Sequence, residues 1–167
     1  MKKVLFALSA LALTSTSVFA ADAGDGTVKF TGEIVDAACV VSPDTQKQEV
    51  VLGQVNKSVF TATPFKIKLE NCDISTFKNV EISFNGVGDA DNSKLVSVST
   101  EPGAATGVGI GIYDNTNTLV DLNTGKSATV LKEGQTVLYF TANYVSTKDA
   151  VTTGYGNAEV DFNLTYN

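Results

Sequence analysis

Residues 158–166 read AEVDFNLTY, and apolar side chains occupy every second position of this stretch. Successive side chains of a β-strand point to opposite faces, so the alternation is typical of a strand with one buried and one solvated face. The apolar row consists of Ala158, Val160, Phe162, Leu164 and Tyr166. The pattern predicts a strand near the C-terminus that contributes this row to a hydrophobic core.

The same alternation recurs along the rest of the chain. The other rows are Val28, Phe30 and Ile34, with Gly32 in the same row; Phe65, Ile67 and Leu69; Val80, Ile82 and Phe84; Val108, Ile110 and Ile112; and Leu138, Phe140, Ala142 and Tyr144. Turn signals such as Asn85-Gly86 and Asn123-Thr124-Gly125 lie between rows. Short strands at roughly ten-residue spacing predict an all-β, antiparallel sandwich of immunoglobulin-like type. A closed barrel is the alternative that this pattern leaves open.

The N-terminus has the three parts of an export signal. Lys2 and Lys3 supply positive charge, Val4 to Leu13 is apolar, and Val18-Phe19-Ala20 fits the small-residue rule for cleavage. The apolar stretch is shorter than the roughly 20 residues that a membrane-spanning helix needs. We therefore expect a signal peptide over residues 1–20, with an uncleaved anchor as the alternative. The mature chain is expected to be soluble and exported.

The composition argues against several classes of function. The net charge of −6 becomes −8 without residues 1–20, because all 18 acidic residues remain while Lys2 and Lys3 are lost. An acidic chain without Arg is a poor nucleic-acid binder, because neutralising phosphates needs a basic patch. The chain also has no His, the usual base of a nucleophile–base pair. Asp89-Ala90-Asp91-Asn92 has oxygen ligands for calcium, but a solvated turn is the simpler interpretation. The sequence predicts no enzyme activity, no metal, no cofactor and no nucleic-acid partner.

Cys39 and Cys72 are the only cysteines in the chain. An even number of cysteines in an exported protein favours a disulfide, and two thiols without His cannot supply the four ligands of an ordinary zinc site. We expect a structural disulfide between them. On the chain-entropy model, closing this loop stabilises the fold by about 4 kcal/mol.

Both ends of the mature chain resemble those of the major pilins of type 1 fimbriae, a chaperone–usher family. The stretch from Gly24 to Cys39, with Gly32 inside its apolar row, is similar to the family's approach to its first cysteine. Val50 to Val55 resembles the family's apolar-Leu-Gly-x-Val segment, and Asn71-Cys72-Asp73 resembles its second-cysteine context.

The C-terminus extends this resemblance. Family members usually have a glycine fourteen residues from the end and a penultimate aromatic residue, and Gly154 and Tyr166 occupy these positions. The resemblance thus runs from Gly26 to Asn167. Each motif alone is weak, and their joint spacing is specific.

The resemblance implies an incomplete sandwich that lacks its seventh strand and is completed by a donor strand from a partner. In the family, a periplasmic chaperone lends a strand to the open groove, and an outer-membrane usher exchanges it for the N-terminal extension of the next subunit. For this chain, the implied organisation is a donor-strand extension over residues 21–36 and a pilin domain over residues 37–167. The implied donor residues are Val28, Phe30, Gly32 and Ile34, and the implied chaperone-facing residues are Gly154, Ala158, Val160, Phe162, Leu164 and Tyr166.

The expected function is that of a structural fimbrial subunit on the bacterial surface, which polymerises with its neighbours and supports cell adhesion. A tip adhesin would usually carry an additional lectin domain, whereas an adaptor subunit would look almost the same as a major subunit. A secreted carbohydrate-binding sandwich is the alternative from another class. The absence of Trp counts against it, as does the placement of much of the Phe and Tyr content in apolar rows.

Overall fold

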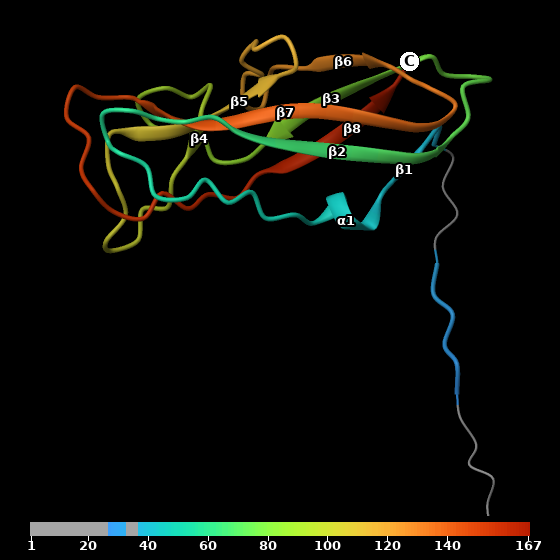
Figure 1. Cartoon of the computed structure of the whole chain (residues 1–167), viewed down its shortest axis with the longest axis horizontal. Helices are drawn as coiled ribbons and strands as arrows, with labels where there is room; N and C mark the ends of the chain where they lie inside the picture. Colours follow the sequence, from blue (N-terminus) through green and yellow to red (C-terminus); the bar gives the residue numbers. More distant parts are fainter. Residues whose placement is uncertain (1–26, 33–36) are drawn as a thin grey trace, which may run out of the picture. The chain divides into compact units, whose positions relative to one another are not determined.

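The computed structural model describes residues 27–32 and 37–167 (Figure 1). The chain divides into two units, Met1–Ile34 and Val35–Asn167. The predicted signal peptide and Ile34 lie outside the described residues. The fold is that of the second unit, and no helix within the described ranges is long and apolar enough to cross a membrane.

The second unit is almost entirely β-structure. Its elements are β1 (Val40–Val41), α1 (Pro43–Gln46), β2 (Thr63–Cys72), β3 (Asn79–Asn85), β4 (Val96–Ser97), β5 (Val108–Asp114), β6 (Ser127–Val130), β7 (Gly134–Ser146) and β8 (Asp161–Tyr166). They form a five-stranded sheet in the order β1-β2-β7-β5-β4 and a three-stranded sheet in the order β6-β3-β8, all antiparallel. The prediction of an antiparallel sandwich is confirmed, because the described strands form two separate sheets.

The apolar rows of the sequence form the core between the sheets. In the β2–β7 pair, Phe65 lies opposite Phe140 and Ile67 opposite Leu138. Ile67, Leu69, Val80, Ile82 and Leu138 are at most 1% exposed. Burying apolar surface at about 25 cal/mol per Å² is the main favourable term in folding, so these rows hold the two sheets together.

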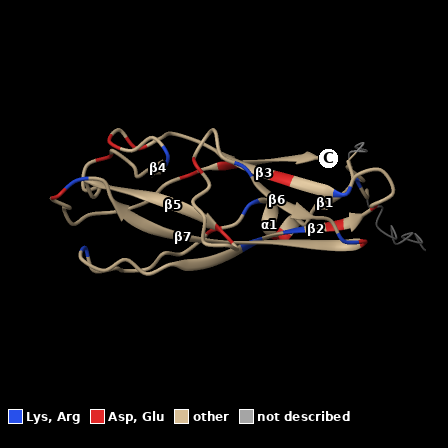
Figure 2. Ribbon diagram, turned by 90° about the horizontal axis from the view of Figure 1, so that it is seen from above, with Lys and Arg blue, Asp and Glu red and all other residues tan. Residues whose placement is uncertain are grey.

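Charged residues are spread over strands and loops of the unit, with lysines and acids interspersed along the ribbon (Figure 2). Exposed ion pairs join Lys94 to Asp121 at 2.8 Å and Lys126 to Glu81 at 2.8 Å. Surface pairs of this kind contribute about 0–1 kcal/mol each. Stability therefore rests on the core and not on these ion pairs.

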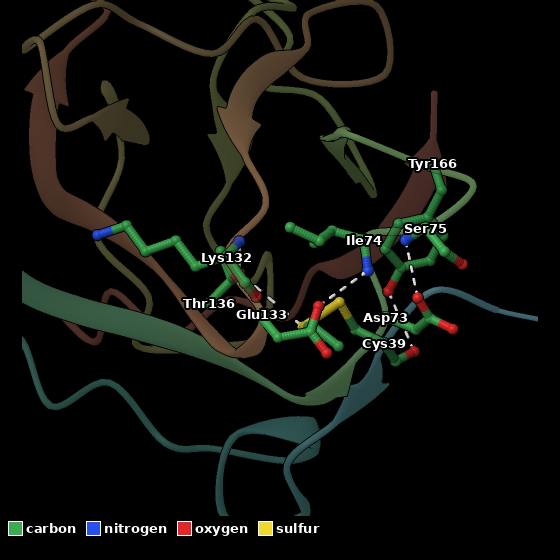
Figure 3. The surroundings of a disulfide bond; sticks show 9 residues. Cys39, Asp73, Ile74, Ser75, Lys132, Glu133, Thr136 and Tyr166 are labelled. Carbon is green, nitrogen blue, oxygen red and sulfur yellow. Dashed lines mark hydrogen bonds between the residues drawn. A yellow bond between two sulfur atoms is a disulfide. The ribbon is translucent and has the colours of Figure 1, made fainter.

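The disulfide predicted between Cys39 and Cys72 is present and buried (Figure 3). It joins the chain just before β1 to the end of β2, and both cysteines are 3% exposed. The hydroxyl of Thr136 lies 3.8 Å from the sulfur of Cys72 and accepts a hydrogen bond from the backbone amide of Lys132. The disulfide therefore fastens the start of the unit to the β2–β7 pair.

We expect thiol titration of denatured, unreduced protein to find no free thiol, and titration after reduction to find two. Replacing both cysteines by serine should lower the free energy of unfolding by about 2–5 kcal/mol, measured by denaturant titration. Two reactive thiols in unreduced material from the oxidising compartment would contradict a structural disulfide.

Candidate functional site

A long groove opens on the surface of the second unit, with a volume of about 930 Å³. One wall is the chain from Thr45 to Gly53, which follows β1 and includes part of α1. The other wall is the chain from Gly156 to Phe162, which leads into β8. The two walls lie about a hundred residues apart in the sequence, so only the fold brings them together.

The floor of the groove is apolar and comes from both sheets. Its residues are Phe65 and Ile67 of β2, Phe84 of β3, Val96 of β4, Ile110 and Ile112 of β5, and Ala142 and Tyr144 of β7. The ring of Phe84 packs edge-on against that of Phe140, with centroids 5.2 Å apart, and Phe65 stacks on Phe140 at 5.5 Å. The groove is therefore a strip of hydrophobic core that the unit does not cover.

Stretches of both walls carry backbone groups without backbone partners among the described residues. β8 is an edge strand that pairs only with β3 in the described part of the chain. Residues 48–55, which lie beyond the helix and outside all strands, make no backbone–backbone hydrogen bond to any described residue. Unpaired N–H and C=O groups on two facing edges form a template for an added strand. The arrangement can therefore bind an extended peptide through its main chain, with alternate side chains on the apolar floor.

Two tyrosines tie chain segments together, one in the groove and one beyond it. The hydroxyl of Tyr166 donates a hydrogen bond to the carbonyl oxygen of Cys39 at 3.2 Å, which ties the end of β8 to the disulfide (Figure 3). Within the groove lining, the hydroxyl of Tyr144 donates a hydrogen bond to the carbonyl oxygen of Gly156 at 2.9 Å. Burial raises the pKa of both phenols, so both remain neutral donors at pH 7.

Three of the six predicted chaperone-facing residues line the groove: Ala158, Val160 and Phe162. Leu164 and Tyr166 lie further along β8, half-buried on the core-facing side. β8 begins only at Asp161, so Ala158 and Val160 precede the strand itself. The alternation of burial in β8 agrees with the predicted inward row.

Gly154 lies outside the groove lining. A Cβ built on Gly154 would lie 2.5 Å from the backbone nitrogen of Ala105, so only glycine fits this close approach of two chain segments. The neighbouring Tyr155 forms a parallel bridge with Ala104. Gly154 therefore positions the chain that leads into the wall, a role that its distance from the C-terminus does not reveal.

Three of the four predicted donor residues, Val28, Phe30 and Gly32, fall in the short described stretch of the first unit. No strand is assigned to residues 27–32, and the side chains of Val28 and Phe30 are 75% and 90% exposed. Both apolar side chains of this stretch are therefore open to contact with another surface. The fourth predicted donor residue, Ile34, is outside the described residues.

Sequence reasoning missed one of the two walls as a site. Val50 to Val55 shows a family resemblance but no sign of a groove, and nothing in the sequence of residues 45–49 indicates one. Asp89 is a turn residue, as expected, because its carboxylate accepts the backbone amides of Asp91 and Asn92 at 3.0 Å. The described residues contain no group of three or more potential metal-ligating side chains.

A model of the fimbrial protein family matches residues 28–167. The chain belongs to this family. The fimbrial chain is 71% identical to long polar fimbria protein A of Salmonella typhimurium, over 99% of this chain and 97% of that protein. It is 70% identical to the probable major fimbrial subunit LpfA of Escherichia coli O157:H7, with the same coverage.

A solved structure of a chaperone–usher pilus, described in relation to rod uncoiling, contains a similar subunit. The TM-score is 0.72 at 29% identity, and the match covers 87% of this chain and 97% of that one. The fimbrial chain is thus a structural subunit of a surface fimbria, exported through the periplasm. The predictions of family and of pilin fold are confirmed.

Proposed function

We propose that this fimbrial protein is the repeating subunit of its fimbria and polymerises by donor-strand exchange, in which residues 27–35 of one subunit fill the groove of the next. The name donor segment is used below for residues 27–35. The observation that carries the proposal is the groove itself, an apolar floor between two facing edges of unpaired backbone. A free edge of this kind promotes aggregation unless another strand covers it.

The donor segment has the dimensions and pattern that the groove requires. Nine residues of extended chain span roughly 30 Å. The walls contribute residues 45–53 and 156–162, which are of comparable length. Val28 and Phe30 are highly exposed and alternate with Lys29 and Thr31. The apolar pair can therefore face the groove while the polar pair faces solvent. A head-to-tail contact of this kind does not close on itself, so it yields a filament.

The same groove needs a temporary occupant before assembly. We propose that a periplasmic chaperone supplies a strand to it, and that an outer-membrane usher directs the exchange for the donor segment. The role of repeating subunit, in place of an adaptor, is supported by the 70% identity to a probable major fimbrial subunit. In this role the chain acts in cell adhesion as a structural element and catalyses no reaction.

The test uses Gly32→Leu with Thr31→Leu as its matched control. Nothing lies within 4 Å of a Cβ built on Gly32, so leucine leaves the donor's own unit undisturbed. In the groove, the added side chain should overpack the floor at a cost of about 1–3 kcal/mol and slow assembly about tenfold or more. Thr31→Leu adds similar bulk on the solvent face and should assemble at close to the wild-type rate.

The measurement is the amount of heat-sensitive fibre ladder in unboiled gels of sheared surface material. Equal ladders from both variants would contradict insertion of the Gly32 face into a groove. Ladder loss from Thr31→Leu alone would show that the segment presents its opposite face.

A further inference from the structure

We propose that an ion pair between Lys29 of one subunit and Asp161 of the next fixes the register in which the donor segment enters the groove. This inference rests on the proposed strand donation and adds to it the residues that select one alignment among several. The alignment follows from the orientation of the added strand, the shape of the groove floor and the charges on the walls.

The orientation limits the alignments. Every strand pair of the described sheets is antiparallel, so we align the donor segment antiparallel to the wall that leads into β8. Shifting an antiparallel strand by one residue turns all its apolar side chains to the opposite face. Only shifts by two residues keep the row of Val28 and Phe30 on the groove floor.

The floor has a large side chain near each end. Phe162 of the wall pairs with Phe84, whose ring packs on that of Phe140 of β7. Four residues further along β7, the ring of Tyr144 lies against Gly156, at about 2.6 Å from a Cβ built there. Aromatic rings therefore fill the floor beside Phe162 and again beside Gly156.

The floor has more room between these two groups of aromatic rings. Ala142 lies between Phe140 and Tyr144 on the same face of β7, and its side chain is only a methyl group. The largest donor side chain, Phe30, therefore fits best over Ala142. Gly32 then comes closer to the ring of Tyr144, where the floor is filled and a side chain would be crowded.

One antiparallel alignment meets these conditions. Its facing pairs are Val28 with Phe162, Phe30 with Val160, and Gly32 with Ala158. All three wall residues line the groove. On the solvent face, the same alignment sets Lys29 directly opposite Asp161.

The two neighbouring alignments are worse. A shift toward the end of β8 sets Val28 opposite Leu164, beyond the residues that line the groove, and Lys29 opposite Asn163. A shift the other way sets Lys29 opposite Glu159, but it moves Phe30 toward the ring of Tyr144. It also sets position 34 opposite Gly154, whose backbone lies against Ala104 and Ala105.

The charges reinforce the alignment. Lys29 and Asp161 are both exposed, and Asp161 takes part in no ion pair among the described residues. Opposite charges directly across an antiparallel pair stabilise it, and like charges destabilise it. The facing wall carries Lys47 and Glu49, one charge of each sign, so it does not favour either sign at position 29.

Cysteine cross-linking reads the register directly. Side chains directly opposite have Cβ atoms about 4.5–5.5 Å apart and diagonal neighbours about 7–8 Å, whereas a disulfide needs about 3.5–4.5 Å. We expect sheared fibres of Lys29→Cys/Asp161→Cys to form intersubunit disulfides on oxidation, giving boiled ladders that disappear with reductant. Lys29→Cys paired with Glu159→Cys or Asn163→Cys should cross-link at least about fivefold less. Stronger cross-linking through position 159 or 163 would overturn the proposed register.

Charge reversal tests the ion pair itself. Lys29→Glu and Asp161→Lys should each accelerate fibre dissociation in warm detergent by about three- to fivefold, and the double variant should return it to within about twofold of wild type. The single effects should shrink in about 0.5 M salt because the charges are exposed. Single variants that match wild type, or a double variant without rescue, would overturn the ion pair. Strand donation itself is judged separately, by whether removal of residues 22–30 stops assembly.

Discussion

Deletion of residues 22–30 is expected to abolish fibre ladders while the unit Val35–Asn167 stays folded in complex with its chaperone. The deletion removes Val28 and Phe30, the exposed apolar residues of the donor segment, but none of the residues that form the core or the groove. On the proposed mechanism, a subunit without them can accept a strand but cannot cover the next groove. Assembly should therefore fall by at least about 100-fold, since a full apolar strand contributes far more than one side chain at about 1.5–3 kcal/mol.

The assays are co-purification with the chaperone and ladder formation in unboiled gels, performed on the same preparation. Long fibres from the deletion variant would rule out donation of these residues. Loss of the fold while the chaperone is present would indicate that the segment completes its own unit. Replacement of residues 22–26 alone, upstream of Val28, is the matched control and should leave assembly near the wild-type level.

Replacing Phe162 and Leu164 by aspartate is expected to abolish a stable chaperone complex without blocking export across the inner membrane. Both side chains are half-buried against the core, and Phe162 lines the groove. Unpaired carboxylates at these positions cost several kcal/mol on burial, which a strand added beside β8 cannot offset. The subunit should appear in the periplasm and be degraded or aggregate there.

The control for this variant is aspartate at Asn163 and Thr165, the outward-facing neighbours on β8. Both residues are exposed, so the two new charges remain in water and the complex should persist. The measurement is the amount of subunit recovered with tagged chaperone from periplasmic extracts. Equal recovery of the two double variants would refute the assignment of the inward row of β8 to the chaperone-facing wall.

The sequence predicts the long strands well because their apolar rows alternate over five or more residues. β2, β3, β5 and β7 each contain the predicted row on the buried side. β1 and β4 contain two residues each, which is too short to show a period. Their pairing is decided by the neighbouring strands, so no local pattern could reveal them.

The start of β8 shows why alternation alone does not give a strand's bounds. The row AEVDFNLTY alternates from residue 158, but β3 ends at Asn85, which lies opposite Asp161. Residues 158–160 therefore have no strand to pair with among the described residues. Their alternation is instead consistent with pairing in the proposed complex, where an added strand supplies the missing ladder.

The groove could be predicted only in part. The inward row of its β8 wall follows from alternation and from the family resemblance. The opposite wall, residues 45–53, depends on packing across the whole unit, and no periodicity marks residues 45–49. The role of Gly154 likewise depends on a contact with Ala104 and Ala105, which a single sequence cannot show.

The structure of the assembled fibre by electron cryomicroscopy tests the central claim most directly. Strand donation predicts continuous density for residues 27–35 in the groove between residues 45–53 and 156–162, connected through Cys39 to a neighbouring subunit. Density in the groove that connects to the same subunit's own Cys39, or a groove without a strand, would contradict it.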